Sequence, residues 1–224
     1  MKYIIKFKKT GVICYTSHLD ILKVFKRSFK RAGIRLAYSH GFNPHPKMGF
    51  AQPLSLGYKG YDEYMEFETA EDYNEKNQQD ILDSLKAIMP EGLTLVSIKE
   101  APELKKTLAS MTVAAEYEIR IHLMKPLTDD ARTLWKKYMG QEIITALKKQ
   151  KKKKEPVLVD IKPKIREIAF NPKEQVLIIQ TRLDAGSESN LSPELLIDTV
   201  MQTLEIECDR AETEISRIRL QFKE

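Results

Sequence analysis

The stretch YTSHLDILKVFKRSFKRAGIRLAYSHGFNPHPKMGFAQPLSL, residues 15–56, joins an amphipathic segment to a loop rich in histidine, asparagine and proline. Ser17 is a typical N-cap residue and Gly33 is the type that commonly follows a helix end, so the sequence predicts a helix between them. At about 100° per residue, Phe25 and Phe29 fall on one side of this helix. The cations fall on the opposite side: Lys23, Lys26, Arg27, Lys30 and Arg31. One face is therefore expected to pack on a core and the other to form a cationic stripe.

The first 60 residues carry a marked excess of positive charge. They contain nine Lys and three Arg but a single acidic residue, Asp20, which gives a formal net charge of +11. Because the whole chain of 224 residues stands at +5, the remainder sums to −6. Such a separation favours a surface that binds a polyanion. The plain alternative is the solvated side of an ordinary helix, although such helices usually carry glutamates beside their cations.

The composition limits the class of protein and its compartment. Hydrophobic residues make up 42% and charged residues 31% of the chain, which is typical of a soluble protein with one large domain or two small ones. No run of about 18 apolar residues is present and the N-terminus is unlike a signal peptide, so we expect a cytoplasmic protein without a membrane partner. Walker, dinucleotide-binding and iron–sulfur motifs are absent, and we expect no cofactor.

Periodicity along the first hundred residues predicts the order strand, helix, strand, strand, helix, strand. A short extended piece over 12–15 is expected before the first helix. This order is that of a ferredoxin-like βαββαβ unit, which we expect over residues 1–101. The segments are a strand at 3–7, the helix from Ser17, strands at 48–56 and 61–69, a helix at 74–89 and a strand at 93–98.

The order partly repeats after a polar connector at 102–110. We therefore expect an α+β protein of two tandem ferredoxin-like units, the second decorated and covering 111–224. A block of six Lys within 148–154 is expected to form a mobile Lys-rich loop in the second unit, because like charges repel one another. The predicted segments are strands at 117–123, 157–161, 175–183 and 215–222, a helix capped by Thr128 and a helix that opens at Ser192 and Pro193.

The loop after the first helix holds most of the groups suited to recognition. Gly41 and the prolines at 44 and 46 exclude a regular helix there. We predict a pocket formed by His18, Asp20, Tyr38, Phe42, Asn43 and His45. Its aromatic rings could stack on unpaired bases, while Lys47 and the five helix cations hold phosphates. The plain alternatives are a packed histidine at 18, an acid beside the helix dipole at 20, turn chemistry at 43 and 45, and core filling by the aromatic rings.

The run from Ser17 to Gly57 resembles the hallmark of a bacterial family of uncharacterised proteins that are fused to, or encoded beside, radical S-adenosylmethionine proteins. The matching residues lie at 17–20, 31–33, 37–39, 41–46, 53–54 and 57, whereas His40 departs from the glutamine of the family. The resemblance implies a companion role to a radical enzyme, with RNA modification as the candidate process. The chain is more remotely similar to the tandem ferredoxin-like endoribonucleases that trim CRISPR repeat RNA, from which no catalytic residue carries over.

Three functions stay open at this point. The favoured one is a non-catalytic RNA-binding or substrate-presenting partner of a radical S-adenosylmethionine enzyme, with transfer RNA and ribosomal RNA as candidate ligands. The second is a metal-independent endoribonuclease that uses His18 or His45 for acid–base chemistry. The third is a protein–protein adaptor with no nucleic-acid role. A metal site made of His18, Asp20 and His45 lacks diagnostic spacing, and we expect no metal.

Overall fold

The computed structural model describes residues 1–70, 78–148 and 155–223. Two compact units are present, one formed by Met1–Thr112 with the C-terminal end from Phe222 onward, the other by Val113–Gln221. Each unit combines antiparallel strands with a few helices, so the predicted α+β class is confirmed. Among the described residues, no helix has both the length and the apolar character needed to cross a membrane.

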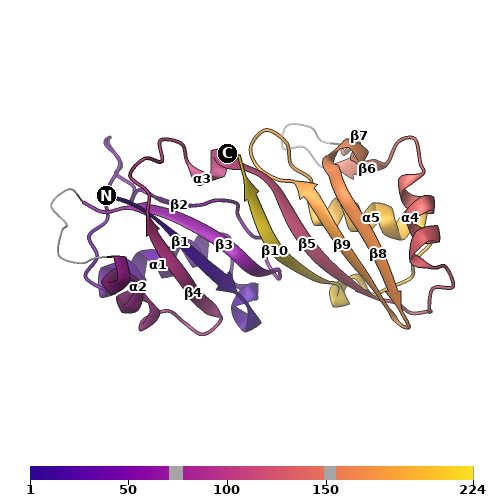
Figure 1. Ribbon diagram of the computed structural model, residues 1–224, viewed down its shortest axis with the longest axis horizontal. Helices are drawn as coiled ribbons and strands as arrows, with labels where there is room; N and C mark the ends of the chain where they lie inside the picture. The colour runs from indigo at the N-terminus through magenta and orange to yellow at the C-terminus, as the bar shows by residue number, and fades with distance from the viewer. Residues whose placement is uncertain (71–77, 149–154, 224) are drawn as a thin grey trace. The chain divides into compact units, whose positions relative to one another are not determined.

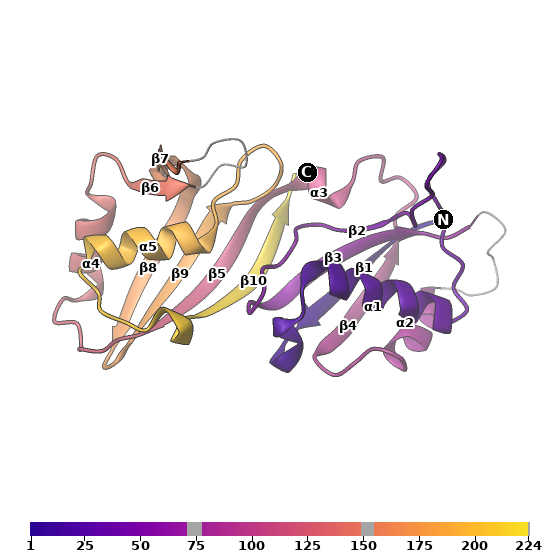
Figure 2. The same cartoon turned by 180° about the vertical axis from the view of Figure 1, so that it is seen from behind.

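In the first unit, β1 lies between β4 and β3, and β2 pairs with β3. All of these pairings are antiparallel. Two helices, α1 and α2, lie on the same face of this sheet (Figure 2). The bounds are β1 Lys2–Lys9, α1 His18–Arg31, β2 Met48–Phe50, β3 Lys59–Glu68, α2 Gln78–Lys86, β4 Leu93–Glu100 and α3 Leu108–Met111.

The core of the first unit lies between this sheet and α1. Phe25 and Phe29 are fully buried, as predicted from the apolar side of the helix. The ring of Phe29 lies 4.5 Å from that of Phe67, and the ring of Phe25 lies 5.2 Å from that of Phe7. Aromatic burial of this kind supplies much of the packing energy of a small domain. It fixes which side of α1 faces solvent.

Both predicted ends of α1 are confirmed. The Ser17 hydroxyl oxygen accepts a hydrogen bond from the Asp20 backbone N–H at 3.2 Å, as an N-cap residue does. At the other end Gly33 has φ +70°, and the Ile34 N–H donates to the carbonyl oxygen of Phe29 at 2.9 Å. This is the Schellman arrangement, which needs a residue that tolerates positive φ.

Two local predictions in the first unit are wrong. Residues 12–15 are not extended but belong to a 3-10 helix, η1 (Gly11–Tyr15), because Gly11 adopts φ +66° and turns the chain. The apolar residues there misled the prediction, since Val12 is 83% exposed. The strand predicted at 48–56 ends at Phe50, and the chain then runs irregularly past Pro53. The first part of the helix predicted at 74–89 lies outside the described residues.

In the second unit the strands follow the order β10, β5, β9, β8 (Figure 1). Helix α5 packs beside α4, where the Tyr138 and Thr199 hydroxyls hydrogen bond at 2.7 Å and burial raises the pKa of Tyr138 to about 12. The bounds are β5 Thr112–His122, α4 Ala131–Met139, β6 Thr145–Lys148, β7 Val157–Asp160, η2 Lys162–Lys164, β8 Ile165–Lys173, β9 Val176–Asp184, α5 Pro193–Thr203, η3 Arg210–Glu212 and β10 Glu214–Phe222.

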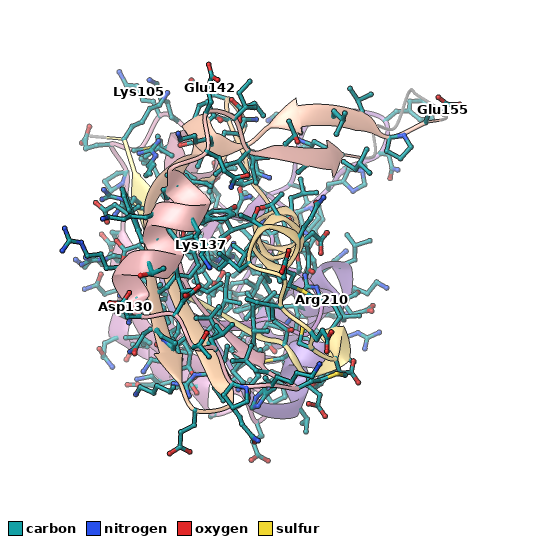
Figure 3. The ribbon with its side chains drawn as sticks, turned by 90° about the vertical axis from the view of Figure 1, so that its right-hand side faces the viewer. Lys105, Asp130, Lys137, Glu142, Glu155 and Arg210 are labelled. Atoms are coloured by element: carbon teal, nitrogen blue, oxygen red, sulfur yellow. The ribbon has the colours of Figure 1, made fainter. Side chains whose placement is uncertain are left out.

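Strands β6 and β7 pair only with each other in the described part of this unit. Figure 3 shows them as a ribbon that projects beyond α5, with Glu155 at its far end. The lysine block begins with Lys148, the last residue of β6. Its remaining residues, 149–154, lie outside the described part of the chain, so the Lys-rich loop stays a prediction.

In the second unit one prediction needs correction, and strand β8 was missed. Helix α4 is capped by Asp130 and not by Thr128, because the Asp130 carboxylate accepts from the Thr133 N–H at 2.8 Å. Strand β8 was not predicted at all. A register shift between Ile165 and Glu167 breaks the alternation that would have revealed it.

Candidate functional site

The five cations of α1 are all exposed, on the side of the helix opposite the buried phenylalanines. We call Lys23, Lys26, Arg27, Lys30 and Arg31 the cationic face. Lys23 forms an ion pair with Asp20 at 2.9 Å. In the described part of the chain, Lys26, Lys30 and Arg31 have no carboxylate within 4.0 Å. Most of this face therefore keeps its charge available for an external anion.

Asp20 is held at the start of α1 and is exposed. Its carboxylate accepts from the Ser17 hydroxyl at 2.7 Å and from the Lys23 ammonium at 2.9 Å. The Ser17 hydrogen bond, followed by the bond and charge of Lys23, lowers the pKa of Asp20. This placement agrees with its plain explanation as an acid near a helix N-terminus.

Several cations outside α1 are neutralised by acids of β3. The pairs are Lys2 with Glu66 at 2.9 Å, Lys6 with Asp62, and Lys47 with Glu68 at 2.8 Å. Strand β1 has Tyr3, Ile5 and Phe7 in the core, so Lys2 and Lys6 lie on the opposite face of the sheet from α1. Only some of the cationic residues in the first 60 positions thus lie on α1.

The loop at 37–47 is firmly braced at its base. The Lys47 N–H donates to the Ala37 carbonyl oxygen at 2.8 Å, and the Ser39 N–H donates to the His45 carbonyl oxygen at 2.8 Å. The His45 N–H in turn donates to the Ser39 hydroxyl oxygen at 3.0 Å. Beyond this brace the residues from His40 to His45 are exposed, and Phe42 is fully exposed. Core filling by Phe42 is therefore wrong, and Tyr38 is also 48% exposed.

His18 lies at a small recess of about 20 Å³ at the start of α1. Its imidazole meets the ring of Phe50, and burial, followed by the charge of Lys9, lowers the pKa of His18. Apolar side chains form much of the recess, namely Phe7, Ile21, Phe50 and Leu54. The polar lining consists of His18, Lys9, Gln52 and Glu63.

The predicted pocket is divided between different places on the first unit. His18 lines the recess, whereas His45 lines another hollow of about 520 Å³ together with Ser39 and Lys47. Phe50 borders both hollows. Among the described residues, no group of three His, Cys, Asp or Glu side chains is arranged to hold a metal ion.

Lys9 and Glu63 are the residues that sequence reasoning missed. Each is only 3% exposed, although both carry charge. A signal was present, because Lys9 continues the buried alternation of Tyr3, Ile5 and Phe7 along β1. Glu63 likewise shares the buried phase of Met65 and Phe67 along β3.

The fold resembles that of proteins in two solved complexes. One is described as "Crystal Structure of a Cbf5-Nop10-Gar1 Complex", with a TM-score of 0.57 and 12% identity over 99% of this chain and 50% of the matched chain. Another is the crystal structure of the archaeal box H/ACA sRNP Nop10-Cbf5 complex, with a TM-score of 0.50 and 11% identity over 96% of this chain and 46% of the other. The present chain spans about half of the chains it matches. At such identity the likeness concerns the fold alone.

A search of curated proteins gave no match. A family model described as "Uncharacterized protein conserved in bacteria (DUF2344)" matches residues 2–193. This match covers most of the sequence, including residues 2–112 of the first unit and much of the second. The chain therefore belongs to DUF2344, a family of uncharacterized proteins conserved in bacteria.

Proposed function

We propose that this protein is a non-catalytic RNA-binding partner that presents RNA to a radical S-adenosylmethionine enzyme. The single observation that carries the RNA part is the cationic face of α1, where three of five cations lack a carboxylate partner among the described residues. Phosphate contacts by lysine and arginine supply most of the affinity of sequence-independent nucleic-acid binding. One of the two structures with a similar fold belongs to an archaeal box H/ACA sRNP, which agrees with this proposal.

We also propose that both units are ferredoxin-like. In the first unit the strands run in the order fourth, first, third, second, when β2 is counted beside β3. In the second unit β10, β5, β9 and β8 give the same order if the β6–β7 ribbon is treated as an insertion. This shared order supports the tandem arrangement with a decorated second unit.

The proposed RNA contacts fall into two groups. The cationic face would hold phosphates, while Phe42, Tyr38, Asn43 and His45 on the braced loop would contact unpaired bases by stacking and hydrogen bonding. Phe42 is fully exposed on a loop whose base is held by hydrogen bonds, and binding residues commonly lie on such loops. Lys47 is a weaker candidate for phosphate, because Glu68 already neutralises it.

The link to a radical enzyme is supported by the sequence signature. Its matching residues at 41–46 lie at the exposed end of the loop, where packing does not explain them. A partner surface or an RNA bound jointly with that partner would explain their exposure. The enzyme would supply the radical chemistry, and this chain would supply binding and orientation.

The proposal is tested by mixing the purified protein with labelled transfer RNA and ribosomal RNA fragments in EDTA. We expect binding that weakens steeply between about 50 mM and about 200 mM salt, with the RNA left intact. Fragments that disappear in a His45→Ala or a His18→Ala variant would instead establish an endoribonuclease. Absence of binding at every salt concentration would leave the protein-adaptor function.

A further inference from the structure

An open hollow lies on the face of the first sheet that is turned away from α1. Its volume is about 440 Å³, within the range of about 300–1,000 Å³ that is usual for small-molecule sites. Ile4 of β1 and Tyr64 of β3 line it, because their neighbours Ile5 and Met65 point into the core on the other face. Both lining side chains are only half-buried, although β1 and β3 are neighbours inside the sheet. We call this space the open-face hollow.

The connector that follows β4 forms the other wall of the open-face hollow. The Ala101 N–H donates to the Lys2 carbonyl oxygen at 2.8 Å, and the Leu108 N–H donates to the Glu66 carboxylate at 3.3 Å. These hydrogen bonds tie the connector to β1 and β3, so the wall is held in place before any ligand binds. The apolar side chains that complete the lining are Leu104, Leu108, Met111 and Phe222.

Most of this lining is apolar. The rings of Tyr64 and Phe222 pack edge to face, with centroids 5.3 Å apart. Ile4 and Met111 add aliphatic and thioether surface that is partly exposed to solvent. Removing such surface from water is favourable, so the open-face hollow favours a ligand with an apolar body.

Polar groups of the lining gather on the side of β4. Lys6 lies opposite Ser97 in the antiparallel pairing, and Lys99 follows two residues later on the same face. The Lys6 ammonium is already paired with the Asp62 carboxylate. Within the described ranges, the Lys99 ammonium and the Ser97 hydroxyl have no partner. One positive charge and one hydroxyl donor are therefore available beside the apolar surface.

These groups select the charged end of the ligand. None of the described side chains that line the open-face hollow is acidic, so a cationic ligand would meet Lys99 with no carboxylate to receive it. A phosphate monoester carries about 1.5 to 2 negative charges at pH 7, whereas a carboxylate carries one. A single carboxylate matches one unpaired ammonium, and it can accept a hydrogen bond from the hydroxyl as well.

We propose that the open-face hollow binds a small apolar monocarboxylate, of which a fatty acid is the simplest kind. The carboxylate accepts hydrogen bonds from Lys99 and Ser97, and the apolar chain lies over Ile4 and Tyr64. This site goes beyond the proposed RNA function and does not depend on it, because α1 and its cationic face lie on the other side of the sheet.

Octanoate is the probe for this site, and two controls separate its parts. The control 1-octanol lacks the charge, and butyrate lacks most of the apolar chain. Each compound would be titrated into the full-length protein while the methyl resonances of Ile4 and Met111 are followed by NMR. We expect octanoate to shift both resonances saturably, and each control to bind at least about tenfold more weakly.

Two lysine variants test the assignment of the carboxylate. Lys99→Gln should weaken octanoate binding about tenfold and leave the binding of 1-octanol unchanged. Lys8→Gln removes an exposed lysine on the same face of β1 that does not line the hollow, and it should bind octanoate as the wild type does. Equal affinity of Lys99→Gln and the wild type for octanoate would overturn the assignment.

The proposal is wrong if octanoate leaves the Ile4 and Met111 methyl resonances unchanged, or if 1-octanol binds as tightly as octanoate. The double variant Lys26→Glu with Lys30→Glu keeps this test apart from that of the RNA function. It should lose RNA affinity and bind octanoate at the wild-type level. A failure of RNA binding therefore leaves the carboxylate site standing, and a failure of octanoate binding leaves the RNA function standing.

Discussion

The imidazole of His18 meets the ring of Phe50 edge to face, with centroids 5.1 Å apart and planes inclined by 61°. This contact places the histidine partly inside the first unit, near the buried ammonium of Lys9. Burial and that positive charge both disfavour the imidazolium form, so the pKa of His18 lies below its ordinary value. The histidine therefore links proton binding to folding.

The first prediction concerns pH and stability. In the unfolded chain His18 binds a proton at about pH 6.5, whereas in the folded protein it binds that proton only at lower pH. The contribution of neutral His18 to the free energy of unfolding is therefore fully present above that pH, and it is lost as the pH falls through the pKa of His18 in the folded protein. Denaturant unfolding at about pH 7.5 and about pH 5.5 should show a smaller loss of stability for His18→Gln than for the wild type.

His40→Gln is the matched control for this measurement, because His40 lies at the exposed end of the loop. It should keep the pH dependence of the wild type. An equal loss of stability in the His18→Gln variant and the wild type would show that His18 does not carry the effect.

The second prediction concerns Gly60. An alanine there would bring its β-carbon within 2.6 Å of Glu63, so the buried carboxylate must shift. Overpacking of this kind costs about 1–3 kcal/mol, and we expect a corresponding drop in the unfolding free energy of Gly60→Ala. Gly49→Ala is the control, since no atom lies within 4 Å of its β-carbon position and its effect should stay within about 0.5 kcal/mol. Equal effects of the two substitutions would contradict the packing described for Glu63.

How far the sequence predicts this fold depends on whether local periodicity agrees with burial. Strand β1 around Ile5 and the helix between Ser17 and Gly33 could be predicted, because most of their apolar residues are buried and most of their polar residues are exposed. Strand β8 was not predicted because a bulge interrupts its alternation of apolar and polar residues. The 3-10 helix η1 was predicted wrongly because its apolar residue Val12 is exposed to solvent. Bulges and exposed apolar residues of this kind depend on contacts between segments distant in sequence, and local sequence patterns give no information about those contacts.

The candidate site was predicted in part. Exposure of the cations on α1 followed from the position of Phe25 on the opposite side of the helix. The grouping of His18 with His45 did not hold, because α1 and the loop place them in separate hollows. Lys9 and Glu63 were missed because lysine and glutamate are rarely buried. Their positions on the inward-facing sides of β1 and β3 were therefore not taken as a sign of burial.

The third prediction concerns the start of α1. Ser17→Ala removes the N-cap hydrogen bond and should destabilise the protein by about 1 kcal/mol. It also removes the hydroxyl that donates to the Asp20 carboxylate, so the pKa of Asp20 should rise toward its ordinary value. Carboxyl carbon shifts followed by NMR during an acid titration would measure this rise. Ser55→Ala, at an exposed position in the loop after β2, should change neither quantity.

The fourth prediction separates binding from stability at two phenylalanines. Phe42 is fully exposed, so Phe42→Ala should leave the unfolding free energy within about 0.5 kcal/mol of the wild type while it weakens RNA binding. Phe29 is fully buried, and Phe29→Ala should cost about 3–5 kcal/mol. RNA affinity measured by fluorescence anisotropy would decide. Unchanged affinity in a folded Phe42→Ala protein would remove the loop from the RNA site.

The central claim is that the cationic face of α1 binds the phosphates of RNA. The dependence of RNA affinity on salt concentration tests this claim most directly. The double variant Lys26→Glu with Lys30→Glu would be compared with Arg132→Glu with Lys136→Glu, which reverses two exposed cations at the same spacing on α4. We predict that the α1 variant loses affinity and lowers the slope of log K against log salt by about 2, whereas the α4 variant keeps the wild-type slope. Equal slopes for the wild type and the α1 variant would contradict the account.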